Sequence, residues 1–88
     1  MSKLVLDLHP IYNQGEKIQQ ELENIIQEAV DKKVQEVEII HGKGSGQLKK
    51  RILKFLDRPD IKSTYSHLKK DFRNSGRVFV YFQWKKRL

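Results

Sequence analysis

The sequence predicts an α/β fold, a two-layer sandwich in which two helices cover a mixed sheet of about four strands. Residues 4–9 and 78–84 have the composition and alternation of strands, and residues 16–33 and 47–56 have the periodicity of amphipathic helices. Glycine, proline and asparagine separate these segments into distinct elements. The predicted order is strand, helix, strand, helix, strand, strand.

The first predicted strand has two distinguishable faces. Its apolar and mixed positions alternate with a period of two: Leu4, Leu6 and Leu8 against Val5, Asp7 and His9. Asp7 and His9 are therefore expected to point to the same side of the sheet. Pro10 has no amide hydrogen and restricts the residue before it. We expect the strand to end at His9 and a loop to continue to Gly15.

Residues 16–33 predict a long helix whose apolar positions form one face. These positions are Ile18, Leu22, Ile25, Ile26, Ala29 and Val30. A second strand is expected around Val37, Ile39 and Ile40, and the glycines that follow it predict a turn. The apolar face of the helix and the second strand together indicate a strand–helix–strand unit.

The second half of the chain predicts one more helix and two more strands. Residues 47–56 carry one apolar stripe, and Arg58-Pro59-Asp60 is expected to end that helix. Residues 61–68 read as a strand of mixed polarity, and a turn at residues 74–76 precedes the strongest strand, residues 78–84. Strand–helix–strand steps favour parallel pairing with right-handed crossovers, and the short turn favours an antiparallel partner at the end.

Composition limits the class of protein. A chain of 88 residues forms one domain with one modest core, and we expect residues 1–88 to be such a domain, standing alone or cut from a longer chain. The absence of cysteine excludes a disulfide scaffold, a thiolate metal site and a cysteine nucleophile. No apolar run approaches the roughly 20 residues of a membrane helix. A cytoplasmic protein without a membrane partner is expected.

The charge of the chain is divided unevenly along its length. Residues 1–44 contain five lysines and eight acidic residues, a net charge of −3, whereas residues 45–88 contain thirteen Lys and Arg and three acidic residues, a net charge of +10. Such asymmetry predicts a basic side that faces a polyanion, with the acidic first helix turned away from it. The alternative is a solubilising surface.

A glycine-rich segment stands where the second strand passes into the second helix. His41-Gly42-Lys43-Gly44-Ser45-Gly46 offers close backbone approach, a cation, a hydroxyl and the amides of a helix N-terminus, all of which suit a phosphate group. It lacks the Lys-Ser/Thr pair of the nucleotide-binding P-loop. The alternative is an ordinary strand-to-helix turn.

Three polar side chains are expected to converge near this loop. If the first two strands are parallel, Asp7 and His9 lie at the same sheet edge as His41. An imidazole can take a proton from attacking water or give one to a departing oxygen, and a carboxylate can orient an imidazole or hold a metal ion. Lys43 and the loop amides would stabilise charge on a phosphate. The alternative is that these side chains only cap the strand ends and hydrogen-bond the loop.

These residues resemble the Smr (small MutS-related) domain family. The resemblance is carried by Leu-Asp-Leu-His at residues 6–9, by His-Gly-Lys-Gly-x-Gly-x-Leu at residues 41–48, and by an ending like Gly-x-x-x-Val-x-Leu at residues 76–82. It implies a sandwich similar to the C-terminal domain of a bacterial translation initiation factor, and nicking or cleavage of DNA or RNA. The family usually has glycine at Pro10 and often arginine at Lys49.

The sequence therefore predicts a nucleic-acid-binding Smr-like domain with endonuclease activity on structured or single-stranded DNA or RNA. Asp7, His9 and His41 are the candidate catalytic residues. The candidate binding residues are Gly42, Lys43, Gly44, Ser45, Gly46, Lys49, Lys50, Arg51 and Arg77. A divalent cation such as magnesium or manganese is a candidate cofactor, without an assigned metal site. The alternatives are a catalytically silent nucleic-acid-binding module and a protein-interaction adaptor attached to a larger host chain or partner protein.

Overall fold

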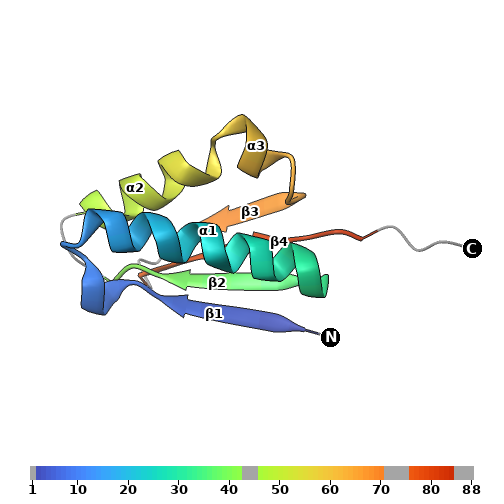
Figure 1. The fold of residues 1–88 in the computed structure, drawn as a ribbon, viewed down its shortest axis with the longest axis horizontal. Coiled ribbons are helices and arrows are strands. Elements are labelled where there is room, and N and C mark those ends of the chain that lie inside the picture. The colour runs from blue at the N-terminus through green and yellow to red at the C-terminus, as the bar shows by residue number, and fades with distance from the viewer. Residues whose placement is uncertain (1, 43–45, 71–75, 85–88) are drawn as a thin grey trace, which may run out of the picture.

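A computed structural model describes residues 2–42, 46–70 and 76–84 of the chain (Figure 1). The elements in order are β1 (Lys3–Asp7), η1 (His9–Ile11, a 3-10 helix), α1 (Gly15–Lys32), β2 (Glu36–Ile40), α2 (Gln47–Leu56), α3 (Pro59–Lys62), β3 (His67–Lys70) and β4 (Arg77–Tyr81). The helices lie over one face of the sheet and leave the other face open. The predicted two-layer α/β class is confirmed.

The sheet is mixed, with strand order β1-β2-β4-β3. β1 and β2 are parallel, and β4 runs antiparallel to both β2 and β3. The parallel pair predicted from the first strand–helix–strand unit and the antiparallel pair predicted at the end are both present. As a result, the carboxyl ends of β1 and β2 meet at one edge of the sheet.

The core fills the layer between the sheet and the helices. α1 presents the face predicted from its periodicity, with Ile18, Leu22 and Ala29 fully buried. α2 adds Ile52 and Leu56, which pack with side chains from alternate positions of β2 and β4. The first helix ends where Lys33 adopts a left-handed conformation and its backbone N–H bonds the carbonyls of the last turn.

The open face of the sheet carries an ion-pair network instead of helices. The Glu38 side chain is only 7% exposed and accepts contacts from Lys3 Nζ at 2.7 Å and Arg77 Nη1 at 2.6 Å. Val5 and Phe79 lie beside Glu38 in the strand register. One carboxylate thus compensates two cations that come from different strands.

Two short helices replace elements that the sequence pattern predicts differently. β1 ends at Asp7, and His9 begins η1 instead of ending the strand. Pro59 opens α3, so Ile61 is a buried helix residue and the strand predicted at residues 61–68 is wrong except for its last two positions. Both differences have the same physical reason. Proline interrupts a strand or a helix, but it also fits the first turn of a new helix.

The end of the last strand also differs from the prediction. β4 ends at Tyr81, short of the predicted end at residue 84. Trp84 instead donates a hydrogen bond from Nε1 to the Val34 carbonyl at 2.8 Å. Of the turn predicted at residues 74–76, only Gly76 is among the described residues. No helix in the described ranges has the length and apolar character that crossing a membrane requires.

Candidate functional site

The carboxyl ends of β1 and β2 bring the two sequence motifs together. Asp7 pairs with Ile40 in the last register position, and Leu8 N donates to the Ile40 carbonyl at 2.9 Å. His9 comes shortly after Asp7, and His41 comes directly after Ile40. Both histidines therefore lie at the same edge of the sheet. Both line a pocket of about 340 Å³, together with Tyr12, Gly42, Gly46, Gln47, Leu48 and Lys49. The juxtaposition predicted from parallel strands is present for the two histidines.

Asp7 does not join the two histidines in the pocket, although the sequence predicts that all three converge there. Its Oδ1 accepts a hydrogen bond from the His9 backbone N–H at 2.9 Å. The carboxylate is exposed and does not line the pocket. Asp7 thus closes the turn by which the chain leaves β1 for η1, as short polar side chains commonly do. It holds the backbone of His9 in place from outside the pocket.

Gly42 sits in close contact with the first motif. Its φ is +80°, and a Cβ at this position would lie 2.7 Å from Cδ2 of His9. A side chain here would be strained by the backbone and would displace the imidazole. Gly42 therefore fixes how closely the two motifs approach.

Gly76 supports the same loop from behind. Its carbonyl accepts hydrogen bonds from the backbone N–H of His41 at 2.7 Å and of Gly42 at 3.0 Å. A Cβ on Gly76 would lie 2.9 Å from the Gly42 carbonyl carbon, and its φ is +78°. The sequence pattern placed Gly76 only in a turn. The signal that it supports the site was its position at the start of the family-like ending.

His41 is the most buried titratable group of the pocket, with 8% of the residue exposed. Its Nδ1 lies 2.7 Å from the Gly42 carbonyl oxygen. Because a carbonyl oxygen can only accept, Nδ1 carries the proton in this contact. Burial lowers the pKa of His41 below its ordinary value, the carbonyl contact opposes this, and the nearby Lys49 lowers the pKa further. When the ring is neutral, Nε2 is therefore the nitrogen without a proton, as a general base requires.

The glycine loop leads into the first turn of α2. Lys43, Gly44 and Ser45 lie outside the described residues. Gly46 has φ of +89° and precedes the helix without a side-chain cap hydrogen bond. The first amides of any α-helix have no partner within the helix. Since Gly46, Gln47, Leu48 and Lys49 line the pocket, this amide-rich helix end faces the two histidines.

The cations of α2 fall on two sides of the helix. Lys49 lines the histidine pocket. A second pocket of about 690 Å³ is lined by Lys50, Arg51, Lys54 and Arg58, with Gln19, Gln47 and Phe55. Gln47 belongs to both pockets, so they adjoin at the start of α2. The guanidinium of Arg51 lies against the start of α1. A Cβ added to Gly15 would lie only 2.9 Å from Nη1 of Arg51.

Not every cation predicted to bind a phosphate is equally placed for it. Arg77 lies on the open face of the sheet, ion-paired with Glu38, and lines neither pocket. Arg58 contacts Glu23 at 3.3 Å and Asp60 at 2.7 Å. The first of these pairs joins α2's end to α1, so the acidic helix lies beside α2 and is not turned away from it.

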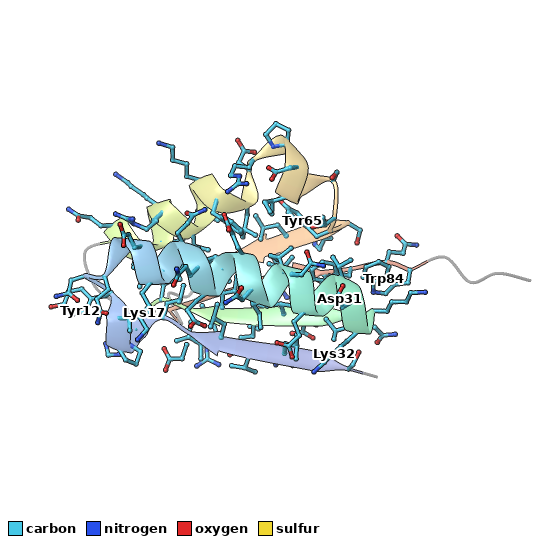
Figure 2. The ribbon with its side chains drawn as sticks, viewed as in Figure 1. Tyr12, Lys17, Asp31, Lys32, Tyr65 and Trp84 are labelled. Carbon is cyan, nitrogen blue, oxygen red and sulfur yellow. The ribbon has the colours of Figure 1, made fainter. Side chains whose placement is uncertain are left out.

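Tyr12 is a pocket residue that the sequence pattern did not single out. It is 66% exposed and follows η1. Figure 2 shows it projecting at the end of the molecule where η1 and α1 meet, opposite the end that carries Trp84. The available signal was an aromatic residue in an otherwise polar loop. By contrast, Tyr65 and Trp84 hydrogen-bond backbone carbonyls from partly buried positions.

The described residues do not assemble an obvious metal site. Within ranges 2–42, 46–70 and 76–84, no group of three or more His, Asp or Glu side chains is placed to hold an ion. Asp7 lies outside the pocket, which leaves the two imidazoles as the candidate metal ligands among its described side chains. The residues in view do not fit a magnesium or manganese centre, because these hard cations prefer several oxygen ligands.

Together, a mixed α/β sandwich and a pocket of two histidines facing a glycine-rich helix start define a small domain built around one sheet edge. A family model described as "Smr domain" matches residues 6–83. The chain belongs to the Smr domain family. The crystal structure of the Smr domain of MutS2 from Thermus thermophilus is similar, with a TM-score of 0.69 and 17% identity over 94% of this chain and 99% of that one. No curated protein matches the chain.

Proposed function

We propose that this Smr domain binds the phosphate backbone of DNA or RNA. We propose further that it cleaves a phosphodiester bond in the histidine pocket, the pocket lined by His9 and His41. The observation that carries the proposal is one pocket lined by His9, by His41 and by the start of α2, with burial lowering the pKa of His41. A base and an acid on either side of a phosphate are the groups that hydrolysis needs.

Binding is proposed to begin at the helix start. The free amides of the first turn of α2 attract an anion, and Lys49 adds a full positive charge at the pocket wall. Flanking phosphates then pass into the adjoining basic pocket, toward Lys50, Arg51 and Lys54. Because no groove-reading motif accompanies these cations, the contacts are proposed to follow the backbone and not the base sequence.

Cleavage is proposed to use the two imidazoles in different roles. Nε2 of His41 takes a proton from the attacking water as its oxygen bonds to phosphorus. The bond from phosphorus to the leaving oxygen breaks, and His9, in the role of general acid, donates a proton to this oxygen. Asp7 is a positioning residue in this scheme, since its carboxylate holds the His9 backbone. Arg77 has no role in it, because Glu38 already engages its guanidinium.

The direct test compares cleavage and binding in the same variants. Supercoiled plasmid and a structured RNA are incubated with wild type, His41→Gln, His9→Gln and Asp7→Asn, and affinity is measured in parallel. His67→Gln is the matched control, because His67 lies on the open sheet face in β3. We expect both pocket variants to lose at least about 100-fold in cleavage, the lower end of a general acid–base contribution. Binding should remain.

The same experiment separates the catalytic proposal from a silent binding module. A wild-type protein that binds both nucleic acids without cutting either would contradict the catalytic roles and leave the binding surface. Equal cleavage by wild type and both pocket variants would place the chemistry elsewhere. An absence of binding in 0.1 M salt would overturn the proposal as a whole.

A further inference from the structure

Tyr12 is an exposed aromatic residue on an anchored stretch of backbone. Its neighbour Ile11 packs against the core, and Ile11 N donates to the Leu8 carbonyl at 3.0 Å while Gln14 N donates to the Ile11 carbonyl at 2.9 Å. Pro10 further restricts the backbone of η1. The chain around Tyr12 is therefore anchored on both sides, although the side chain itself projects into solvent (Figure 2).

The ring makes none of the contacts that usually explain a tyrosine. In the part of the chain that the structure describes, its hydroxyl has no hydrogen-bond partner and its ring has no aromatic or cation neighbour. Val5 is the other large apolar side chain exposed to this degree among the described residues, and it lies on the open sheet face. Tyr12 alone of these two lines the histidine pocket.

We infer that Tyr12 is a stacking platform for an unpaired nucleobase next to the phosphate held in the pocket. This inference rests on the proposed function and narrows it to substrates with an unpaired nucleotide at the site. A base in an intact duplex is already stacked on its neighbours, so it offers no free face to the ring. Aromatic rings accept any base on their face, which agrees with a surface that follows the backbone.

The inference is tested by removing either the ring or the bases. Affinity is measured by fluorescence anisotropy for a labelled oligothymidylate and for an oligomer of the same length whose sugars carry no bases. The two oligomers have the same phosphates. Wild type is compared with Tyr12→Ala, with Tyr12→Phe, which keeps the ring, and with Tyr81→Ala, which removes an aromatic ring on the open sheet face.

Tyr12→Ala should weaken binding of oligothymidylate by about 5- to 150-fold, the range of base–aromatic stacking. It should leave binding of the baseless oligomer within about twofold of wild type, and Tyr12→Phe and Tyr81→Ala should bind both like wild type. Circular dichroism establishes that each variant is folded. On a blunt duplex of the same length, Tyr12→Ala and wild type should bind alike.

Two results would overturn the inference. If Tyr12→Ala loses the same affinity for both oligomers, Tyr12 acts through the phosphates or the fold. If wild type binds both oligomers with the same affinity, no base stacks on the protein. In both cases the proposed backbone binding survives. If wild type binds neither oligomer at 0.1 M salt, the proposed function fails and the stacking role fails with it.

Discussion

Two groups of cations among the described residues differ in what surrounds them. Lys3 and Arg77 converge on the buried carboxylate of Glu38, on the open face of the sheet. Lys50, Arg51 and Lys54 line the basic pocket of α2 and form no ion pair with a described residue. The formal net charge of +7 therefore overstates the positive charge that a bound polyanion can contact. We propose that the first group stabilises the fold and that the second group binds the nucleic acid.

The largest expected effect is on nucleic-acid affinity when the second group is neutralised. The triple variant Lys50→Gln/Arg51→Gln/Lys54→Gln should bind single-stranded nucleic acid about 100-fold more weakly at 0.1 M salt. The slope of log affinity against log salt should fall by about 2, because each lost phosphate contact contributes roughly 0.7. Binding isotherms at several salt concentrations measure both quantities.

A control variant tests whether position or charge alone decides this result. Lys32→Gln/Lys62→Gln removes two cations that are ion-paired with Glu28 and Asp57. Its affinity and salt slope should stay close to those of wild type. If each removed charge costs the same in both variants, net charge explains the binding and the assignment of α2 is wrong.

A smaller effect, on folding stability, is expected from the first group. Glu38→Gln removes the charge that two cations share in a side chain only 7% exposed, and should lower the free energy of unfolding by about 1–3 kcal/mol. Nucleic-acid affinity should not fall. Urea unfolding measures the first quantity, and anisotropy measures the second.

Glu36 provides the matched control for Glu38. It is more exposed and lies 3.7 Å from Lys3. Glu36→Gln should therefore change stability by less than about 0.5 kcal/mol, as exposed ion pairs do. Equal losses from the two substitutions would mean that the open-face network does not stabilise the fold through its buried carboxylate.

The smallest expected effect is the dependence of stability on pH that His41 contributes. Because burial lowers its pKa in the folded state, the unfolded chain binds a proton first as the pH falls below 6.5. The contribution of His41 to stability is complete above that pH and is lost as the pH falls toward the folded-state pKa. It amounts to about 1.4 kcal/mol for each unit by which folding lowers the pKa. His41→Gln should remove this part of the acid sensitivity.

Unfolding by urea between pH 7.5 and 5 gives the comparison, with His67→Gln as control. His67 lies on the exposed edge strand β3, outside the pocket, so this variant controls for the loss of one imidazole. An unchanged pH dependence in His41→Gln would show that the ring is not held neutral by its surroundings.

Hydrophobic periodicity predicted the elements whose formation depends on local pattern. α2 has the predicted bounds, and α1 differs by one residue at each end. η1 and α3 were not predicted, because Pro10 and Pro59 have the same sequence signal whether they end an element or begin a helix. The choice between those outcomes depends on burial of Ile61 and on tertiary contacts that the local sequence does not contain.

The candidate site was predictable where topology alone decides it. Parallel pairing of β1 and β2 is enough to bring His9 and His41 to one edge of the sheet, independently of side-chain contacts. The turn closed by Asp7, the support from the Gly76 carbonyl and the pairing of Arg77 depend on which atoms meet after folding. The contact of Asp7 is local, between residues two apart, and agrees with the alternative that this side chain caps the strand end. The contacts of Gly76 and Arg77 join segments up to 39 residues apart, so neither spacing nor composition indicates them.

The most direct test of the central claim is a map of backbone amide chemical shifts during titration with a short single-stranded oligonucleotide. The claim is that phosphates bind at the histidine pocket and along α2. It predicts the largest changes at Gly42, Gly46 and the residues of α2, with little change at Lys69 and Phe79 on the open face. Changes concentrated on the open face, with α2 unaffected, would contradict it.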